Sequence, residues 1–164
     1  MGTGEGAAGE SRDERLNREL LELLNELRVA LPGVQVLFAF LLTLPFTSRF
    51  AELSELQRNV YFATFLSTMA SSAFLMTPTA FHRIRFRQSD KEWLLTLCNR
   101  MAIAGLVGLA LSLAGAVFLV SDVVFGTTGA AVASAATAAL VGGLWFVLPI
   151  IRSIRDRGSD DPQP

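Results

Sequence analysis

Four long apolar stretches dominate the pattern of hydrophobic and polar positions along this chain. A helix rises about 1.5 Å per residue, so roughly 20 apolar residues cross a hydrocarbon core of roughly 30 Å. Because lipid offers no hydrogen-bonding partners, each stretch must satisfy its own backbone polar groups as a helix. The pattern therefore predicts an all-α membrane protein, a four-helix transmembrane bundle with spans at residues 30–48, 59–80, 101–121 and 130–150.

The segment before the first span, residues 11–31, has leucines at helical spacing and charged residues on the other face. Ser11 and Glu14 have the spacing of a capping box, in which each side chain bonds the other residue's backbone N–H. This amphipathic juxtamembrane helix is expected to lie along the cytoplasmic membrane surface or to pack against a partner helix. Pro32-Gly33 is expected to end or redirect it.

Basic residues are sorted to one side of the predicted spans. Four precede the first span, five lie between the second and third, and three follow the fourth, whereas the first link holds two and the third link none. Short loops rich in arginine and lysine stay in the cytoplasm. We therefore expect a multi-pass protein of the cell membrane with both termini cytoplasmic. Residues 1–10 form a disordered tail, residues 30–150 the membrane domain, and residues 151–164 a basic and then disordered tail.

Composition supports the membrane-protein class and limits the kinds of functional site that we expect. Hydrophobic residues make up 51% of the chain and the mean hydropathy is +0.44, both high for a soluble domain. The single cysteine, Cys98, excludes an internal disulfide and is expected to be an inert apolar residue. No metal cluster, cofactor site or catalytic constellation is evident, so we expect no cofactor and no enzyme activity. Acidic residues before the first apolar run argue against a cleavable signal.

Small residues recur at every fourth position in the last two spans. Lipid tails are as apolar as leucine, so helices in membranes associate by close contact, which small residues permit. Two facing ladders predict a tight hairpin of spans three and four, and homo-oligomer formation through small-residue faces. The ladders are Ala104, Gly108, Ser112 and Ala116 in span three, and Ala131, Ala135, Ala139 and Gly143 in span four.

The second span is unusually rich in hydroxyl side chains, which can bond back to their own helix carbonyls or cross to a neighbouring helix. They are Thr64, Ser67, Thr68, Ser71, Ser72 and Thr77. Just before this span, Ser54 and Gln57 have capping-box spacing. Pro45, near the end of the first span, is expected to kink that helix.

An ion transporter usually holds a charged group within the membrane, yet the interiors of these spans contain no Asp, Glu, Lys or Arg. A transport path would therefore depend on uncharged polar side chains within the spans and on Asp122 at the outer end of span three. Asp122 otherwise marks only a helix end. The candidate polar path is Gln35, Ser67, Ser71 and Asp122.

The link between spans two and three carries alternating basic and apolar residues, followed by a Ser89–Glu92 capping-box pattern. Arginines beside a membrane attract anionic lipid headgroups, by about 1 kcal/mol per charge. The stretch is short and interrupted by acids, so no nucleic acid partner is expected. Candidate headgroup or partner contacts are His82, Arg83, Arg85, Arg87 and Arg100.

Several short motifs resemble those of a known family. They are ELRV at 26–29, GVQ at 33–35, LFAFLL at 37–42, LPF at 44–46, Pro78 with FHR at 81–83, FR at 86–87 and NR at 99–100. Over about residues 16–124, the chain resembles small uncharacterised actinobacterial membrane proteins that carry a domain-of-unknown-function label. The resemblance implies four spans and no established activity. Some members are automatically named sodium/proton antiporters, but the carboxylate that such exchange needs is missing from the span interiors.

Two hypotheses follow from the sequence. The leading one is a non-enzymatic structural or interaction protein of the membrane, which self-associates through its small-residue helix faces and contacts lipid headgroups or a membrane partner. The alternative is a small ion or solute transporter, sodium/proton antiporter-like, that acts as an oligomer because four spans enclose little volume.

Overall fold

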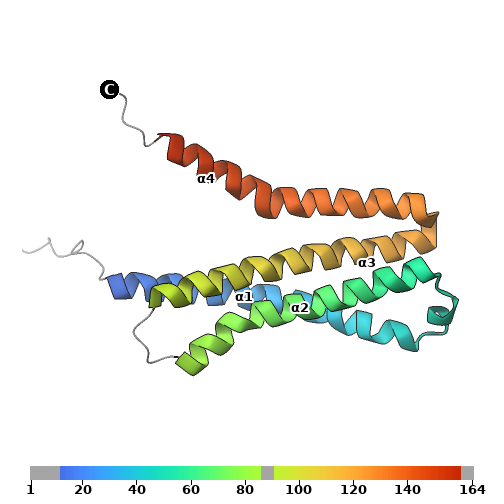
Figure 1. The fold of residues 1–164 in the computed structure, drawn as a ribbon, viewed down its shortest axis with the longest axis horizontal. Coiled ribbons are helices and arrows are strands. Elements are labelled where there is room, and N and C mark those ends of the chain that lie inside the picture. Colours follow the sequence, from blue (N-terminus) through green and yellow to red (C-terminus); the bar gives the residue numbers. More distant parts are fainter. Residues whose placement is uncertain (1–11, 86–90, 160–164) are drawn as a thin grey trace, which may run out of the picture.

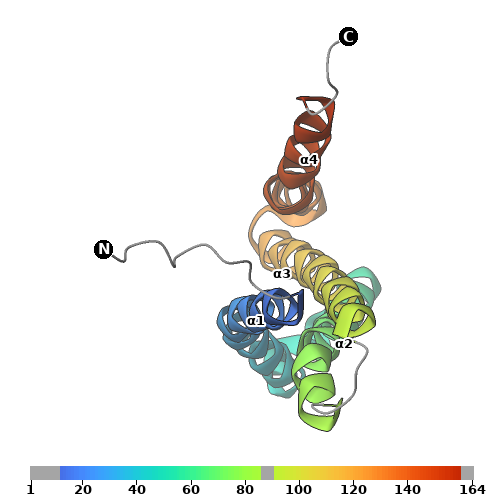
Figure 2. The ribbon, with the colours of Figure 1, turned by 90° about the vertical axis from the view of Figure 1, so that its left-hand side faces the viewer.

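The computed structural model describes residues 12–85 and 91–159, and every extended element in these ranges is a helix. Three long helices, α1 (Arg12–Thr43), α2 (Glu55–Arg85) and α3 (Lys91–Gly142), run alongside one another (Figures 1 and 2). Two 3-10 turns, η1 (Leu44–Phe46) and η2 (Ser48–Glu52), connect α1 to α2. A π-helical turn, η3 (Gly143–Val147), leads from α3 into α4 (Leu148–Ser159). The predicted all-α class is confirmed for the described chain.

The chain reverses direction within α3, at Gly126 (Figure 1). Its backbone angles are φ 75° and ψ 175°, a region that is essentially restricted to glycine. The turn is also tight at Gly129, where an added Cβ would lie 2.6 Å from the Cβ of Phe125. We call residues 91–125 the first arm of α3 and residues 127–159 the fourth segment. The reversal falls in the predicted link between the third and fourth apolar stretches.

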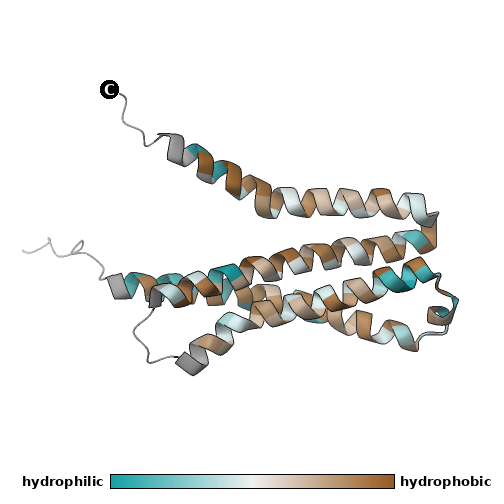
Figure 3. Ribbon diagram, in the orientation of Figure 1, coloured by the Kyte–Doolittle hydropathy of each residue, from teal (hydrophilic) through white to brown (hydrophobic). Residues whose placement is uncertain are grey.

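The helices of the described chain expose many large apolar side chains. Three helical stretches are long and apolar enough to cross a membrane, Glu14–Phe46, Glu55–Phe81 and Trp93–Arg152, and the last contains the Gly126 reversal. Large apolar side chains such as Phe40, Leu111 and Leu140 point outward, and apolar residues cover much of the helix surfaces (Figure 3). The buried polar residues are small hydroxyls, Thr64, Thr68, Ser71 and Ser112. This arrangement suits a lipid surround, in which polar groups are satisfied inside.

The first helix does not end at Pro32-Gly33, contrary to the sequence-based expectation. α1 continues from Arg12 to Thr43 and is therefore about 48 Å long at 1.5 Å per residue. One leucine-rich face runs through the proline: Leu27 and Val34 are buried in a cluster with Leu75 of α2 and Ala102 of the first arm. Packing of this face compensates for the hydrogen bond that Pro32 cannot make. The second half of the amphipathic segment, from Leu23 to Leu31, thus packs within the protein.

The connection between α1 and α2 is compact and well capped. The backbone N–H of Ser54 donates to Oε1 of Gln57 at 2.9 Å, and the N–H of Gln57 donates to Oγ of Ser54 at 3.2 Å. This reciprocal pair confirms the capping box at the start of α2. Pro45 lies in η1 rather than in a kinked helix, because α1 already ends at Thr43. The other two capping-box patterns, at Ser11 and Ser89, lie outside the described residues.

The expected four-helix bundle is not confirmed. The core consists of residues from α1, α2 and the first arm, whereas the fourth segment lies beside the first arm (Figure 2). Its axis bends at η3 and α4 continues away from the other helices (Figure 1). Pro149 explains the bend, since it lacks the N–H that an α-helix would direct at the carbonyl four residues earlier. The fold is a three-helix core with an apolar outlying segment.

Candidate functional site

Two serines of α2 join it to the first arm of α3. Oγ of Ser67 donates to the carbonyl of Gly108 at 3.0 Å, and Oγ of Ser71 donates to the carbonyl of Gly105 at 2.6 Å. The hydroxyls of Thr64, Thr68 and Thr77 instead donate to carbonyls four residues earlier in α2. Both alternatives left open by the sequence therefore occur, and the crossing bonds come from the two serines of the candidate path.

Small residues of the first arm allow this close approach. A Cβ added to Gly108 would lie 3.1 Å from the Cβ of Ser71, and one added to Gly115 would lie 2.0 Å from Oγ1 of Thr64. Ser112 is buried, and its hydroxyl donates to the carbonyl of Gly108 at 2.8 Å. Ala104 is half-buried in the same arm. Of the ladder predicted in span three, Gly108 thus faces α2.

The ladder predicted in span four does not face the first arm. Ala131, Ala135 and Ala139 are exposed, and a Cβ on Gly143 would meet nothing within 4 Å. The contact with the first arm uses another face of the fourth segment. There Ala130 is fully buried, and Oγ of Ser134 donates to the carbonyl of Ala114 at 3.0 Å. The expected pair of facing ladders is therefore wrong, although the third-to-fourth hairpin itself is present.

The four residues of the candidate polar path do not line one route. Ser67 and Ser71 lie between α2 and the first arm, with their hydroxyls bonded to carbonyls. Gln35 is exposed on α1, and Asp122 lies near the Gly126 turn. The sequence could not place them, because it gives neither the rotation of α1 nor the partner of each hydroxyl.

Of the candidate headgroup contacts, Arg100 is exposed near the start of α3. The side chains of His82, Arg83 and Arg85, and all of Arg87, lie outside the described residues. Cys98 is buried, in the same part of α3. Within residues 12–85 and 91–159, no group of three or more His, Cys, Asp or Glu residues is arranged to hold a metal ion.

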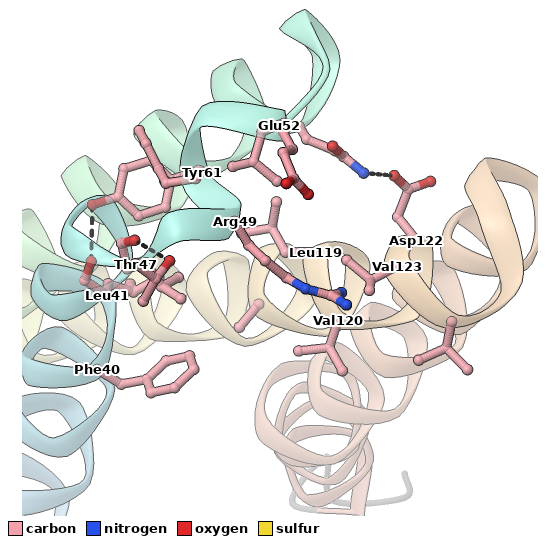
Figure 4. Close-up of a pocket in the computed structure, with 16 residues that line it drawn as sticks. Phe40, Leu41, Thr47, Arg49, Glu52, Tyr61, Leu119, Val120, Asp122 and Val123 are labelled. Carbon is pink, nitrogen blue, oxygen red and sulfur yellow. Dashed lines mark hydrogen bonds between the residues drawn. The ribbon is translucent and has the colours of Figure 1, made fainter.

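A cavity of about 670 Å³ lies between the residue 44–54 connection and the first arm. We call residues 44–54 the 44–54 link. This volume falls within the roughly 300–1,000 Å³ of small-molecule sites. The apolar wall includes Phe40 and Leu41 at the end of α1, and Ala116, Leu119 and Val120 in the first arm. The cavity is therefore formed by segments distant in sequence, which meet only in the folded chain (Figure 4).

Polar groups gather at one end of the cavity, where Arg49 and Glu52 come from the 44–54 link and Asp122 from α3 (Figure 4). Nε2 of Gln57 donates to Oδ2 of Asp122 at 2.5 Å. Oδ1 of Asp122 is buried and has no hydrogen-bond partner among the described residues. A carboxylate oxygen in this state lacks the donors that usually stabilise it. Asp122 is the one candidate path residue that lines the cavity.

Aromatic packing supports the wall of the cavity beside α2. The hydroxyl of Tyr61 donates to the carbonyl of Leu41 at 2.9 Å, which ties α2 to the end of α1. The ring of Phe50 meets that of Tyr61 edge to face, with centroids 5.1 Å apart. No sequence pattern predicted Arg49, Glu52 and Tyr61 as site residues. One signal was present: Arg49 is one of only two basic residues in the first link, where the charge pattern otherwise excludes them.

Residues 9–149 match a family of unknown function (DUF6328). Because the match covers most of the chain, the protein belongs to that family. No curated protein and no solved structure matches the chain.

Proposed function

We propose that the protein is a non-enzymatic component of the cell membrane that crosses the bilayer four times and self-associates through its fourth segment. In this topology, α1, α2, the first arm and the fourth segment each make one crossing, and both termini are cytoplasmic. The distribution of arginine and lysine supports the orientation. The reversal at Gly126 supports two crossings within the last apolar stretch.

One observation carries the proposal: the small-residue ladder of the fourth segment is exposed. Ala131, Ala135 and Ala139 lie on a face that no other described helix covers. Small residues four apart let two helices approach closely and gain van der Waals contact that lipid tails do not provide. A second copy of the same ladder offers a matching surface, and a two-fold contact closes a dimer.

The experiment is dimerisation of the full chain in lipid vesicles, measured by energy transfer between labelled copies over a range of protein-to-lipid ratios. Ala135→Leu places a bulky side chain in the ladder, and we expect the dimer to weaken by about 1–2 kcal/mol, or about fivefold to thirtyfold. The matched control is Ala136→Leu, the same change at an exposed position outside the ladder. Equal effects of the two substitutions, or no energy transfer at all, would reject the proposal.

The cavity favours a second candidate function, that of a small solute or ion transporter. Asp122 lines the cavity and has an unpartnered carboxylate oxygen, a group that can bind a cation or a proton. Asp122→Asn keeps the shape of this side chain and removes its charge. If the protein transports ions, sodium- or proton-driven flux in proteoliposomes is abolished in this variant while Glu55→Gln, outside the cavity, retains it. An unchanged flux in Asp122→Asn would contradict the transporter.

A further inference from the structure

We propose that the cavity beneath the 44–54 link binds an amphiphile with a primary ammonium head group and an apolar chain. This inference is independent of the proposed self-association, because no residue of the exposed ladder lines the cavity. It rests on the division of the cavity into an apolar and a polar end, on the charges at the polar end, and on the unpartnered oxygen of Asp122.

The cavity has an apolar side and a charged side. Phe40 and Leu41, from the last turn of α1, lie on one side, and Arg49, Glu52 and Asp122 lie toward the other (Figure 4). Its charged residues come from the 44–54 link and from the last turns before Gly126. A molecule with one apolar and one polar end fits this division, with its chain against Phe40 and Leu41 and its head group beside Asp122.

The charges at the polar end favour a cation. Two carboxylates, Glu52 and Asp122, line the cavity with one guanidinium, Arg49. No salt bridge joins Arg49 to either carboxylate in the described structure. A cationic head group would balance the remaining negative charge.

The geometry of Asp122 favours a head group with N–H donors. Oδ2 accepts from Gln57, whereas Oδ1 is buried without a donor. Asp122 lines the cavity, and the terminal torsion of an aspartate is soft, so its carboxylate can exchange the amide of Gln57 for another donor there. A primary ammonium can then donate to it, which relieves the cost of a buried carboxylate oxygen that lacks a partner.

A quaternary ammonium is the weaker fit. It has no N–H to donate, and proteins bind such groups in cages of open aromatic faces. Here the ring of Tyr61 already packs against Phe50 and Phe65, with centroid distances of 5.1 and 6.3 Å. These rings are engaged with one another rather than arranged as a cage.

The primary ammonium can come from two sources. One is a soluble alkylamine. The other is a membrane aminophospholipid, whose phosphate group would lie against Arg49 while its ammonium meets Asp122. Both share the chemistry that the cavity selects, and a competition experiment distinguishes them.

The experiment is equilibrium dialysis of labelled decylammonium against the full chain in nanodiscs of phosphatidylcholine. Empty nanodiscs correct for partition of the probe into lipid. We expect saturable binding, at least about tenfold tighter than that of decyltrimethylammonium, because a hydrogen bond to a charged group is worth about that factor or more. This comparison needs no variant, so it does not depend on whether a substituted chain folds.

Two variants then assign the binding to Asp122. Asp122→Asn is expected to weaken decylammonium binding by about tenfold to a hundredfold. Glu55→Gln removes a carboxylate close to the cavity but not in its lining, and is expected to leave binding unchanged. Binding no greater than in empty nanodiscs, equal binding of the quaternary analogue, or equal loss in both variants would overturn the proposal.

A final measurement identifies the source of the primary ammonium. Phosphatidylethanolamine is added to the nanodiscs, and decylammonium binding is measured again with the wild-type chain and with Arg49→Gln. If the aminophospholipid is a ligand, it competes with decylammonium in the wild type and competes less in Arg49→Gln. If only soluble amines bind, decylammonium binding is the same with and without this lipid. Both results agree with a site for primary ammonium amphiphiles.

Discussion

At the scale of single residues, the interface between α2 and the first arm depends on glycines, whose side chain is a single hydrogen atom. Gly115 lies so close to α2 that a methyl group would overlap Oγ1 of Thr64. Nearby, the carbonyls of Gly105 and Gly108 accept hydrogen bonds from serines of the facing helix. Close approach and interhelical hydrogen bonding therefore depend on the same glycines.

Gly115→Ala is expected to destabilise the protein by about 1–3 kcal/mol, as overpacking of a close contact does. The measurement is thermal unfolding in detergent, with Gly142→Ala as the control. A Cβ at Gly142 meets nothing within 4 Å, so that change is expected to be neutral or to stabilise the helix. Thr64→Ala in the Gly115→Ala background removes the clashing oxygen and restores part of the stability. Equal unfolding temperatures for Gly115→Ala and Gly142→Ala would refute the close contact.

At the scale of elements, the apolar pattern predicted the helices well because lipid leaves the backbone few alternatives. The capping box of Ser54 and Gln57 was also readable, since its two partners are three residues apart. The continuation of α1 through Pro32 could not be predicted from the sequence. Whether a proline ends a helix depends on packing against distant residues, here Leu75 and Ala102, which no local pattern reveals.

The cavity was beyond local inference for the same reason. Gln57 and Asp122 are 65 residues apart in the sequence. Nε2 of Gln57 and Oδ2 of Asp122 lie 2.5 Å apart only because α2 packs beside the first arm. Periodicity identified small residues in both of the last spans, yet it did not give the rotation of either helix. As a result, the small-residue pattern predicted a contact of Gly108 with the fourth segment, whereas Gly108 lies against Ser67 and Ser71 of α2.

The hairpin between the first arm and the fourth segment depends on Gly126. Gly126→Ala forces a side chain into a backbone region that costs about 1–3 kcal/mol outside glycine. With Cys98→Ala as background, cysteines placed at Ala114 and Ser134 report the contact, since Oγ of Ser134 lies 3.0 Å from the carbonyl of Ala114. We expect cross-linking between them to fall in Gly126→Ala and to persist in Gly142→Ala. An undiminished yield would mean that the hairpin does not need this conformation.

At the scale of the whole molecule, the turns lie at two opposite ends. The start of α1, the end of α2 and the start of α3 lie together at one end, whereas the 44–54 link and Gly126 lie at the other (Figure 1). The first of these ends carries most of the basic residues of the sequence. The proposed orientation places that end in the cytoplasm and the cavity at the opposite face of the membrane.

Reporter fusions test this orientation. A fluorescent protein that matures in the cytosol is expected to be bright after residue 164 and dark after residue 127, and a phosphatase that works outside the cytosol is expected to show the reverse. A fusion after residue 88 serves as the internal control and should match the C-terminus. Cytosolic fluorescence from the fusion at residue 127 would contradict the four-crossing topology.

The unbroken course of α1 gives the molecule a mechanical connection. One continuous helix extends from Arg12 to Thr43, and its far end supplies Phe40 and Leu41 to the cavity wall. In the proposed four-crossing topology, this helix links the cytoplasmic end of the molecule to the cavity, a link that a break at Pro32 would remove.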